Sequence, residues 1–134
     1  MSKRMVEYFA EVDGEALPVG VAIARELMRT GADWAYCTET FGGRLVLLSA
    51  DARCVETDAP AGEVVDRLRA GNGGSLAGLP DVVAACGNVI VLREAKRPHK
   101  DKLSVAQHRM ADVARRRFAG RLDLGLVEWG AATR

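Results

Sequence analysis

The chain has 134 residues, a length that suits one domain and leaves little room for two. Hydrophobic residues make up 49% of it and charged residues 28%, which is typical of a soluble globular protein and argues against a disordered chain. No apolar run approaches the roughly eighteen residues that span a bilayer, and residues 1–15 lack an apolar core of signal-peptide length. We therefore expect one cytoplasmic domain over residues 1–134 that does not contact a membrane.

The cysteines and histidines restrict the chemistry that the chain can perform. The three cysteines, Cys37, Cys54 and Cys86, form no Cys-x-x-Cys pair. With only two histidines, His99 and His108, a structural zinc site is not expected. We interpret the cysteines as reduced core or strand residues.

Charge is distributed unevenly although the net charge is only +1. Residues 1–92 carry eight Lys and Arg against thirteen Asp and Glu, whereas residues 93–121 carry ten against three. Such asymmetry is typical of a surface that faces a polyanion. A solvated helix face would explain the same charges, so both interpretations stay open at this point.

The first part of the chain predicts one helix. Residues 17–30 are expected to be helical, because Pro18 is tolerated in a first turn and Gly31 follows as a stop. Residues 5–12 are a short strand or an extended arm, and the pattern is too brief to decide.

A hairpin is expected next. Residues 34–40 and 44–49 are predicted strands, and Phe41, Gly42 and Gly43 between them favour a turn. Residues 53–57 can add a short third strand, and residues 61–70 are predicted to form a short helix or a helix-like turn.

Residues 71–78 form a glycine-rich loop. A Walker-type phosphate loop ends in Gly-Lys-Ser/Thr, which is absent here, and the dinucleotide fingerprint is missing too. We expect these glycines to let the backbone pass close to another element on its way to Asp81.

The second half of the chain gives the clearest elements. Residues 79–85 are a predicted strand, residues 86–88 a turn, and residues 89–96 a strand so apolar that burial on both faces is expected. Residues 104–119 are the clearest helix and residues 122–129 the last strand. Ser104 and Gln107 have the spacing of a capping box at the start of that helix. Its apolar contacts are expected from Val105, Met110, Val113, Ala114 and Phe118.

Asp81, Glu94 and Lys96 are the candidate catalytic cluster. Side chains alternate along a strand, so Glu94 and Lys96 point to the same face. The turn near Gly87 can fold the strand of Asp81 against theirs, which brings two carboxylates and an ammonium to one place.

That combination predicts phosphodiester hydrolysis. Two carboxylates with waters and a substrate phosphate suit Mg²⁺, which uses few protein oxygens. The metal activates a water and polarises the phosphoryl oxygen, and Lys96 can orient that water or neutralise the charge that develops. The alternative is structural: Asp81 can be a turn residue, and Glu94 and Lys96 an exposed ion-paired edge.

The spacing of these residues resembles the PD-(D/E)xK nuclease superfamily, in its VRR-nuclease and Holliday-junction-resolvase-like branches. Pro80-Asp81, then twelve residues, then Glu94-Ala95-Lys96 is the motif, and Leu103 to Gln107 matches the helix that follows. The resemblance covers residues 71–129. It implies an α/β fold with a restriction-endonuclease-like core, in which helices flank a central mixed sheet, and residues 34–57 then form an N-terminal hairpin insertion.

The resemblance also implies site residues. Asp81 and Glu94 would bind Mg²⁺ or Mn²⁺, Lys96 would assist the nucleophile, and Gln107 would join the site, although the capping box alone explains Gln107. An acid from the preceding helix often completes such sites, which makes Glu26 the candidate metal ligand. Glu63 is its rival.

A basic stretch leaves the strand of Glu94 and continues along the following helix. In a nuclease these side chains would contact phosphates rather than read bases. The candidates for nucleic-acid binding are Arg97, Lys100, Lys102, Arg109 and Arg116.

The sequence thus predicts a Mg²⁺- or Mn²⁺-dependent endonuclease, with DNA favoured over RNA as the substrate and with branched or flapped structures among the candidates. Small nuclease cores often pair, so a homodimer is an open expectation. Two alternatives remain: a nucleic-acid-binding module that keeps the fold without the chemistry, and a regulatory protein whose Glu-x-Lys is accidental.

Overall fold

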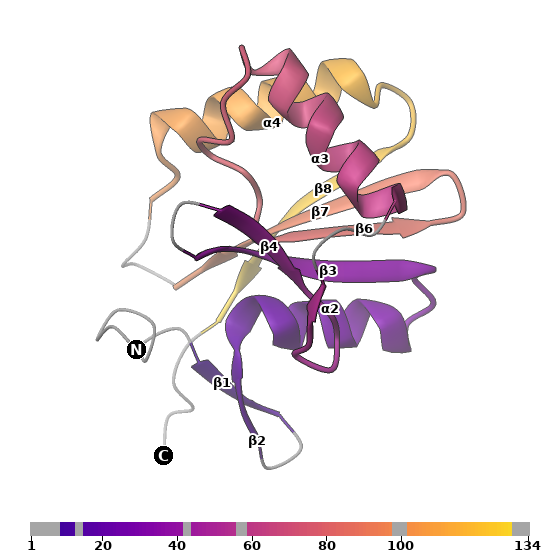
Figure 1. The fold of residues 1–134 in the computed structure, drawn as a ribbon, viewed down its shortest axis with the longest axis vertical. Helices are drawn as coiled ribbons and strands as arrows, with labels where there is room; N and C mark the ends of the chain where they lie inside the picture. Colours follow the sequence, from indigo (N-terminus) through magenta and orange to yellow (C-terminus); the bar gives the residue numbers. More distant parts are fainter. Residues whose placement is uncertain (1–8, 13–14, 42–43, 56–58, 98–101, 130–134) are drawn as a thin grey trace.

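A computed structural model describes residues 9–12, 15–41, 44–55, 59–97 and 102–129 of the chain. It is a three-layer α/β arrangement with a mixed sheet in the middle (Figure 1). Helices α3 (Ala59–Gly71) and α4 (Val105–Arg117) cover one face of the sheet. Helix α2 (Val19–Arg29) covers the other, next to a small hairpin of β1 (Phe9–Val12) and β2 (Glu15–Pro18).

The central sheet has six strands in the order β5-β4-β3-β6-β7-β8. All neighbours are antiparallel except β7 (Val89–Lys96) and β8 (Leu122–Glu128), which run parallel because α4 crosses between them. The expected α/β fold with a mixed sheet between helices is confirmed.

The predicted N-terminal hairpin is continuous with this sheet. It consists of β3 (Trp34–Phe41) and β4 (Arg44–Leu48), and a short β5 (Cys54–Val55) follows. Strand β3 pairs with β4 on one side and with β6 (Val82–Cys86) on the other. Its first strand therefore lies beside the strand that follows Asp81.

Alternation along β6 and β7 divides the core between the two faces. Val83, Ile90 and Leu92 pack towards α3 and α4, whereas Val82 and Val91 pack towards α2. Three consecutive buried residues, from position 90 to 92, confirm that β7 is covered on both faces. Glu94 and Lys96 lie on the same face of the sheet as Ile90 and Leu92, which is the face covered by α4.

Helix α4 begins as the sequence predicts, with a capping box between Ser104 and Gln107. Met110, Val113 and Phe118 are buried in the core as expected. Val105 was expected to join them but is 74% exposed, because it stands in the first turn on the side away from the sheet.

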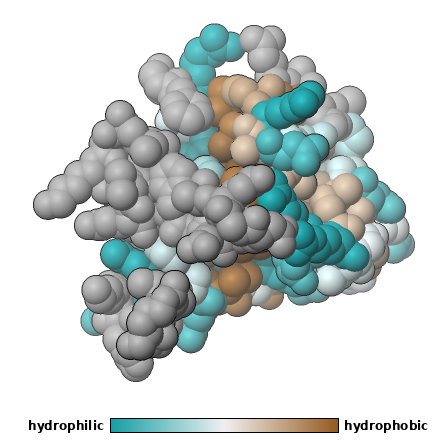
Figure 2. Space-filling model, turned by 90° about the horizontal axis from the view of Figure 1, so that it is seen from below, coloured by the Kyte–Doolittle hydropathy of each residue, from teal (hydrophilic) through white to brown (hydrophobic). Residues whose placement is uncertain are grey.

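The face of the molecule on the α2 side shows hydrophobic residues gathered between hydrophilic ones in its described part (Figure 2). On α2, Val21 and Ala24 are fully buried, while Met28 near its C-terminal end is 40% exposed. Among the helices that the structure describes, none has the length and apolarity to cross a membrane.

Candidate active site

Asp81 lies immediately before β6, where β3 holds its backbone in place. The hydroxyl of Thr38 donates a 2.6 Å hydrogen bond to the carbonyl of Pro80, and the amide of Thr38 donates to the carbonyl of Asp81 at 2.8 Å. Pro80 itself is buried. The position of Asp81 is therefore fixed by β3, which it contacts, and by β6, which it immediately precedes.

Asp81 reaches across to β7 with its side chain. The amide of Ala95 donates a 2.8 Å hydrogen bond to Oδ2 of Asp81. Because Ala95 stands between Glu94 and Lys96, this bond anchors the Asp81 carboxylate at the Glu-x-Lys segment. The structure thus brings the predicted pair of acids together.

The carboxyl groups of Asp81 and Glu94 interact directly. Burial, the negative charge of Asp81 and a hydrogen bond between the two carboxyl groups together raise the pKa of Glu94 from 4.5 to about 9. Hydrogen bonds from the Asp81 backbone and from the Gln107 side chain act in the opposite direction. At neutral pH and without a cation, the pair therefore retains a proton.

Gln107 connects α4 to this pair. Its Nε2 atom donates a 2.7 Å hydrogen bond to Oε1 of Glu94, and its Oε1 atom accepts a 2.8 Å bond from the amide of Ser104. The two interpretations of Gln107 do not compete, because one side-chain amide serves the helix cap and the acid at the same time.

Lys96 lies at the end of β7 on the same face as Glu94, and it is partly buried. Its register partner on the parallel strand β8 is Glu128. The alternation of side chains that predicted a common face for Glu94 and Lys96 is therefore realised in a regular strand.

Glu39 on β3 is a further acid at this place, and the sequence interpretation did not include it. It is partly buried. Burial raises its pKa and the charge of Asp81 raises it too, while a hydrogen bond from the Cys37 thiol lowers it. The Cys37 Sγ atom lies 3.6 Å from Oε1 of Glu39. Burial and the charges of Glu39 and Asp81 raise the pKa of Cys37, so this thiol stays protonated and is not a nucleophile.

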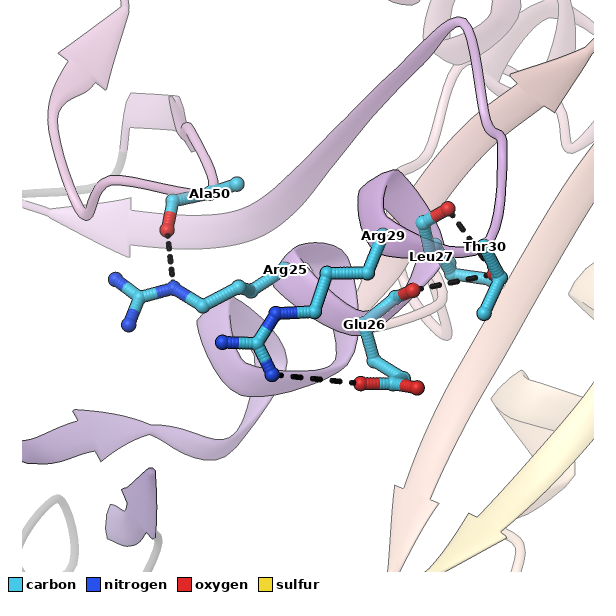
Figure 3. A network of polar contacts seen from close by, with 6 residues as sticks. All are labelled: Arg25, Glu26, Leu27, Arg29, Thr30 and Ala50. Atoms are coloured by element: carbon cyan, nitrogen blue, oxygen red, sulfur yellow. Dashed lines mark hydrogen bonds and ion pairs between the residues drawn. The ribbon is translucent and has the colours of Figure 1, made fainter. Parts of the chain in front are cut away.

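Glu26 does not lie with these residues. Its side chain is 66% exposed on α2, and a carboxylate oxygen lies 3.9 Å from Nη1 of Arg29 (Figure 3). Its backbone carbonyl accepts a hydrogen bond from Thr30 in the same turn. Glu63 is exposed on α3. Neither Glu26 nor Glu63, the two acids expected from the preceding helices, therefore lies with Asp81 and Glu94 in the structure.

The donor set fits a cation that needs few protein ligands. Within the described ranges no group of three or more His, Cys, Asp or Glu side chains is arranged to hold a metal ion. Asp81 and Glu94 repel each other, however, when both are ionised, and a divalent cation would remove that repulsion. Mg²⁺ and Mn²⁺ suit such a pair, because waters can complete their coordination.

Two of the expected nucleic-acid-binding residues, Arg109 and Arg116, lie on α4. Lys102, Arg109 and Arg116 are exposed and Arg97 is partly buried, while Lys100 lies outside the described residues. Arg116 belongs to the last turn of α4, where positive charge also complements the helix dipole.

Comparison with known families places this geometry in context. The model of the family described as archaeal Holliday junction resolvase (Hjc) matches residues 59–126, which is half of the chain. The matched segment contains Asp81, Glu94, Lys96 and Gln107. Searches among curated proteins and among solved structures find no significant match. The chain belongs to the archaeal Holliday junction resolvase family, and through it to the PD-(D/E)xK nuclease superfamily.

Proposed function

We propose that this protein is a divalent-metal-dependent endonuclease that hydrolyses phosphodiester bonds in branched DNA. The observation that carries the proposal is the pair of Asp81 and Glu94, whose carboxyl groups meet where two neighbouring strands leave the core. The family description supports DNA, and a branched structure of it, as the substrate.

Asp81 and Glu94 are the residues that would hold Mg²⁺ or Mn²⁺. When bound, the cation polarises the phosphoryl oxygen and lowers the pKa of a water molecule. The chain itself supplies an orienting framework: the Ala95 amide fixes Asp81 and the Gln107 amide fixes Glu94. Glu39 adds a negative charge that Asp81 experiences, which strengthens the attraction for a cation.

Lys96 provides the positive charge on the same face as Glu94. Its ammonium group can donate to an attacking water or to a phosphate oxygen, and so stabilise charge that grows in the transition state. A strand holds it two residues from Glu94, which is more rigid than a loop would be.

The first test compares substrates, metals and variants. Purified protein is incubated with plasmid, a synthetic four-way junction, a flapped duplex, a linear duplex and the matching RNA, in Mg²⁺, Mn²⁺ or chelator. We expect metal-dependent cleavage of the branched DNA. Asp81→Asn and Glu94→Gln should slow it by about 100-fold or more, while Glu63→Gln on the exposed side of α3 should cleave normally.

Binding is measured beside cleavage, by gel shift in chelator. If the junction is bound but never cut in either metal, and Asp81→Asn behaves as the wild type, the protein is a binding module and the proposal is wrong. Light scattering of the same samples tests the expected homodimer, which would present two acid pairs to the two strands of a duplex.

A further inference from the structure

A pocket opens beside the acid pair, between α4 and the parallel strands β7 and β8. Its volume is about 390 Å³, and Glu94 and Gln107 stand among its lining residues. Most of the remaining wall is apolar, with Leu92, Leu103 and Leu124 among its side chains. An apolar pocket that contains the candidate catalytic acid is not required by a phosphate or by a hydrated cation, because both prefer polar surroundings.

Leu126 is the most unusual member of this wall. It is 52% exposed, one of few large hydrophobic residues in the described part of the chain that are so open to solvent. Leu126 is the register partner of Glu94 across the parallel pair of β7 and β8, so the two side chains are neighbours on one face of the sheet. An exposed apolar side chain next to a catalytic acid favours a ligand that has an apolar surface close to its reacting group.

The polar members of the pocket wall point to an anionic ligand. His108 and Arg115, both on α4, line the pocket together with the apolar residues. Arg115 is 61% exposed and lies 2.9 Å from Asp112, so its guanidinium group remains open to solvent on its other side. A ligand with a flat apolar body and a negatively charged chain matches this combination of leucines and basic groups.

We propose that this pocket receives one unpaired nucleobase of the DNA, adjacent to the phosphodiester held at Asp81 and Glu94. The inference rests on the proposed endonuclease function and narrows its substrate to branched DNA in which the nucleotide beside the cleaved bond is unpaired or leaves its base pair on binding. The pocket volume lies at the lower end of the about 300–1,000 Å³ that ligand sites occupy, which suits a single nucleoside. A base that is already unpaired enters such a pocket without the cost of breaking a base pair.

The test uses two four-way junctions that differ in one nucleotide. One carries a base beside the cleaved bond and the other carries an abasic analogue there. We expect the wild type to cut the first about tenfold faster, since the apolar contacts between the base and the pocket wall are lost with the base. Leu126→Asn should remove this preference. Met28→Asn is the matched control, because Met28 is also an exposed apolar residue but lies on α2, across the sheet.

A second measurement follows the base itself. With 2-aminopurine at that position and Asp81→Asn protein, which leaves the DNA intact, binding should change the fluorescence. Adding Leu126→Asn should abolish the change, whereas adding Met28→Asn should keep it. Circular dichroism confirms that each variant is folded.

The outcomes separate this inference from the function on which it rests. If the wild type cuts no DNA, the proposed function is wrong. If it cuts the base-bearing and abasic junctions equally, the nuclease stands and the nucleobase pocket is overturned. If Leu126→Asn dissociates a dimer while the preference for the base persists, the pocket is an interface between two copies and the inference is again overturned.

Discussion

Gln107 joins the start of α4 to Glu94, through a 2.7 Å hydrogen bond from its Nε2 atom to Oε1 of the glutamate. The same side chain accepts from the amide of Ser104 at 2.8 Å, while the Ser104 hydroxyl accepts from the amide of Gln107 at 3.1 Å. The orientation of an acid in the sheet is therefore coupled to the first turn of a helix that packs over it. Because both partners of the cap can be changed separately, the two roles can be measured apart.

Gln107→Ala should reduce cleavage about tenfold or more, because Glu94 loses a hydrogen bond made to a charged group. Ser104→Ala is the matched control, since it removes the cap and keeps the contact with Glu94. Both variants should have a free energy of unfolding that is about 1 kcal/mol lower than that of the wild type. Only Ser104→Ala should keep a cleavage rate within about twofold of the wild type.

The pH dependence of the rate distinguishes positioning from stability. The Gln107 amide lowers the pKa of Glu94, so its removal should raise that pKa and move the acid limb of the pH–rate profile to higher pH. Ser104→Ala should leave the limb in place. Equal profiles for the two variants would show that Gln107 serves the helix only.

The stability of the metal-free protein should fall as the pH rises. The pKa of Glu94 is raised from 4.5 to about 9 in the folded chain, first by burial and then by Asp81. Because the folded chain holds the Glu94 proton more tightly than the unfolded chain does, the protonated Glu94 stabilises the fold. This stabilisation is complete below the pKa of Glu94 in the unfolded chain, and it is lost as the pH rises through the pKa in the folded chain. In chelator, Tm of the wild type relative to Glu94→Gln should therefore decline between about pH 5 and pH 9.

Divalent metal should reverse this decline. A bound cation requires the ionised form of Glu94, so binding releases a proton and tightens as the pH approaches 9. Differential scanning fluorimetry at several pH values, with Mg²⁺ or with chelator, measures both effects. A difference in Tm between wild type and Glu94→Gln that is constant with pH would contradict the shared proton.

Glu39 and Glu26 provide a direct comparison of two acids. Glu39→Gln should raise the Mg²⁺ concentration for half-maximal cleavage by about tenfold, because Asp81 loses a neighbouring negative charge. Glu26→Gln should leave it unchanged, since this exposed carboxylate lies beside Arg29 on α2. If Glu26→Gln raises this Mg²⁺ concentration and Glu39→Gln leaves it unchanged, Glu26 rather than Glu39 is the additional acid.

The sequence could predict that Asp81 and Glu94 lie together, because their proximity depends on local structure. A turn of two residues folds β6 onto β7, and the alternation of side chains decides which face each one occupies. The strand Val89–Lys96 was predicted to the residue because its apolar run is continuous. The start of α4 followed from the chemistry of its cap.

Glu39 could not be placed in the same way. Its strand pairs with β6 although residues 42–81, with β4, β5 and α3, separate the two in sequence. Such pairing is set by burial on the two sheet faces, which no single strand pattern encodes. The exposure of Val105 has a similar origin, because helical spacing gives a face but not the neighbour that covers it.

The basic side chains on α4 should contribute to DNA binding through phosphate contacts. Arg109→Ala and Arg116→Ala should each weaken junction binding and lower the slope of log affinity against log salt by about one. Arg29→Ala, on α2 across the sheet, removes an equal charge and should preserve the slope. Fluorescence anisotropy over a range of salt concentrations gives these slopes, and equal slopes for all three variants would assign the DNA to another face.

Gly78 shows why a glycine stands three residues before Asp81. It has a φ of +81°, and a Cβ atom there would lie 2.1 Å from the carbonyl oxygen of Ala106 in the first turn of α4. Gly78→Ala should therefore lower the free energy of unfolding by about 3 kcal/mol, from backbone strain and a clash with backbone that cannot yield.

Gly73→Ala is the matched control, since its φ is +67° and nothing lies within 4 Å of the added carbon. It should lose only the backbone cost of about 1 kcal/mol. Urea unfolding measures both values, and an equal loss would mean that the loop can move away from α4. Because the amide of Gln107 would lie 2.7 Å from the same Cβ, the clash should also disturb the contact with Glu94 and lower cleavage at temperatures where the variant is folded.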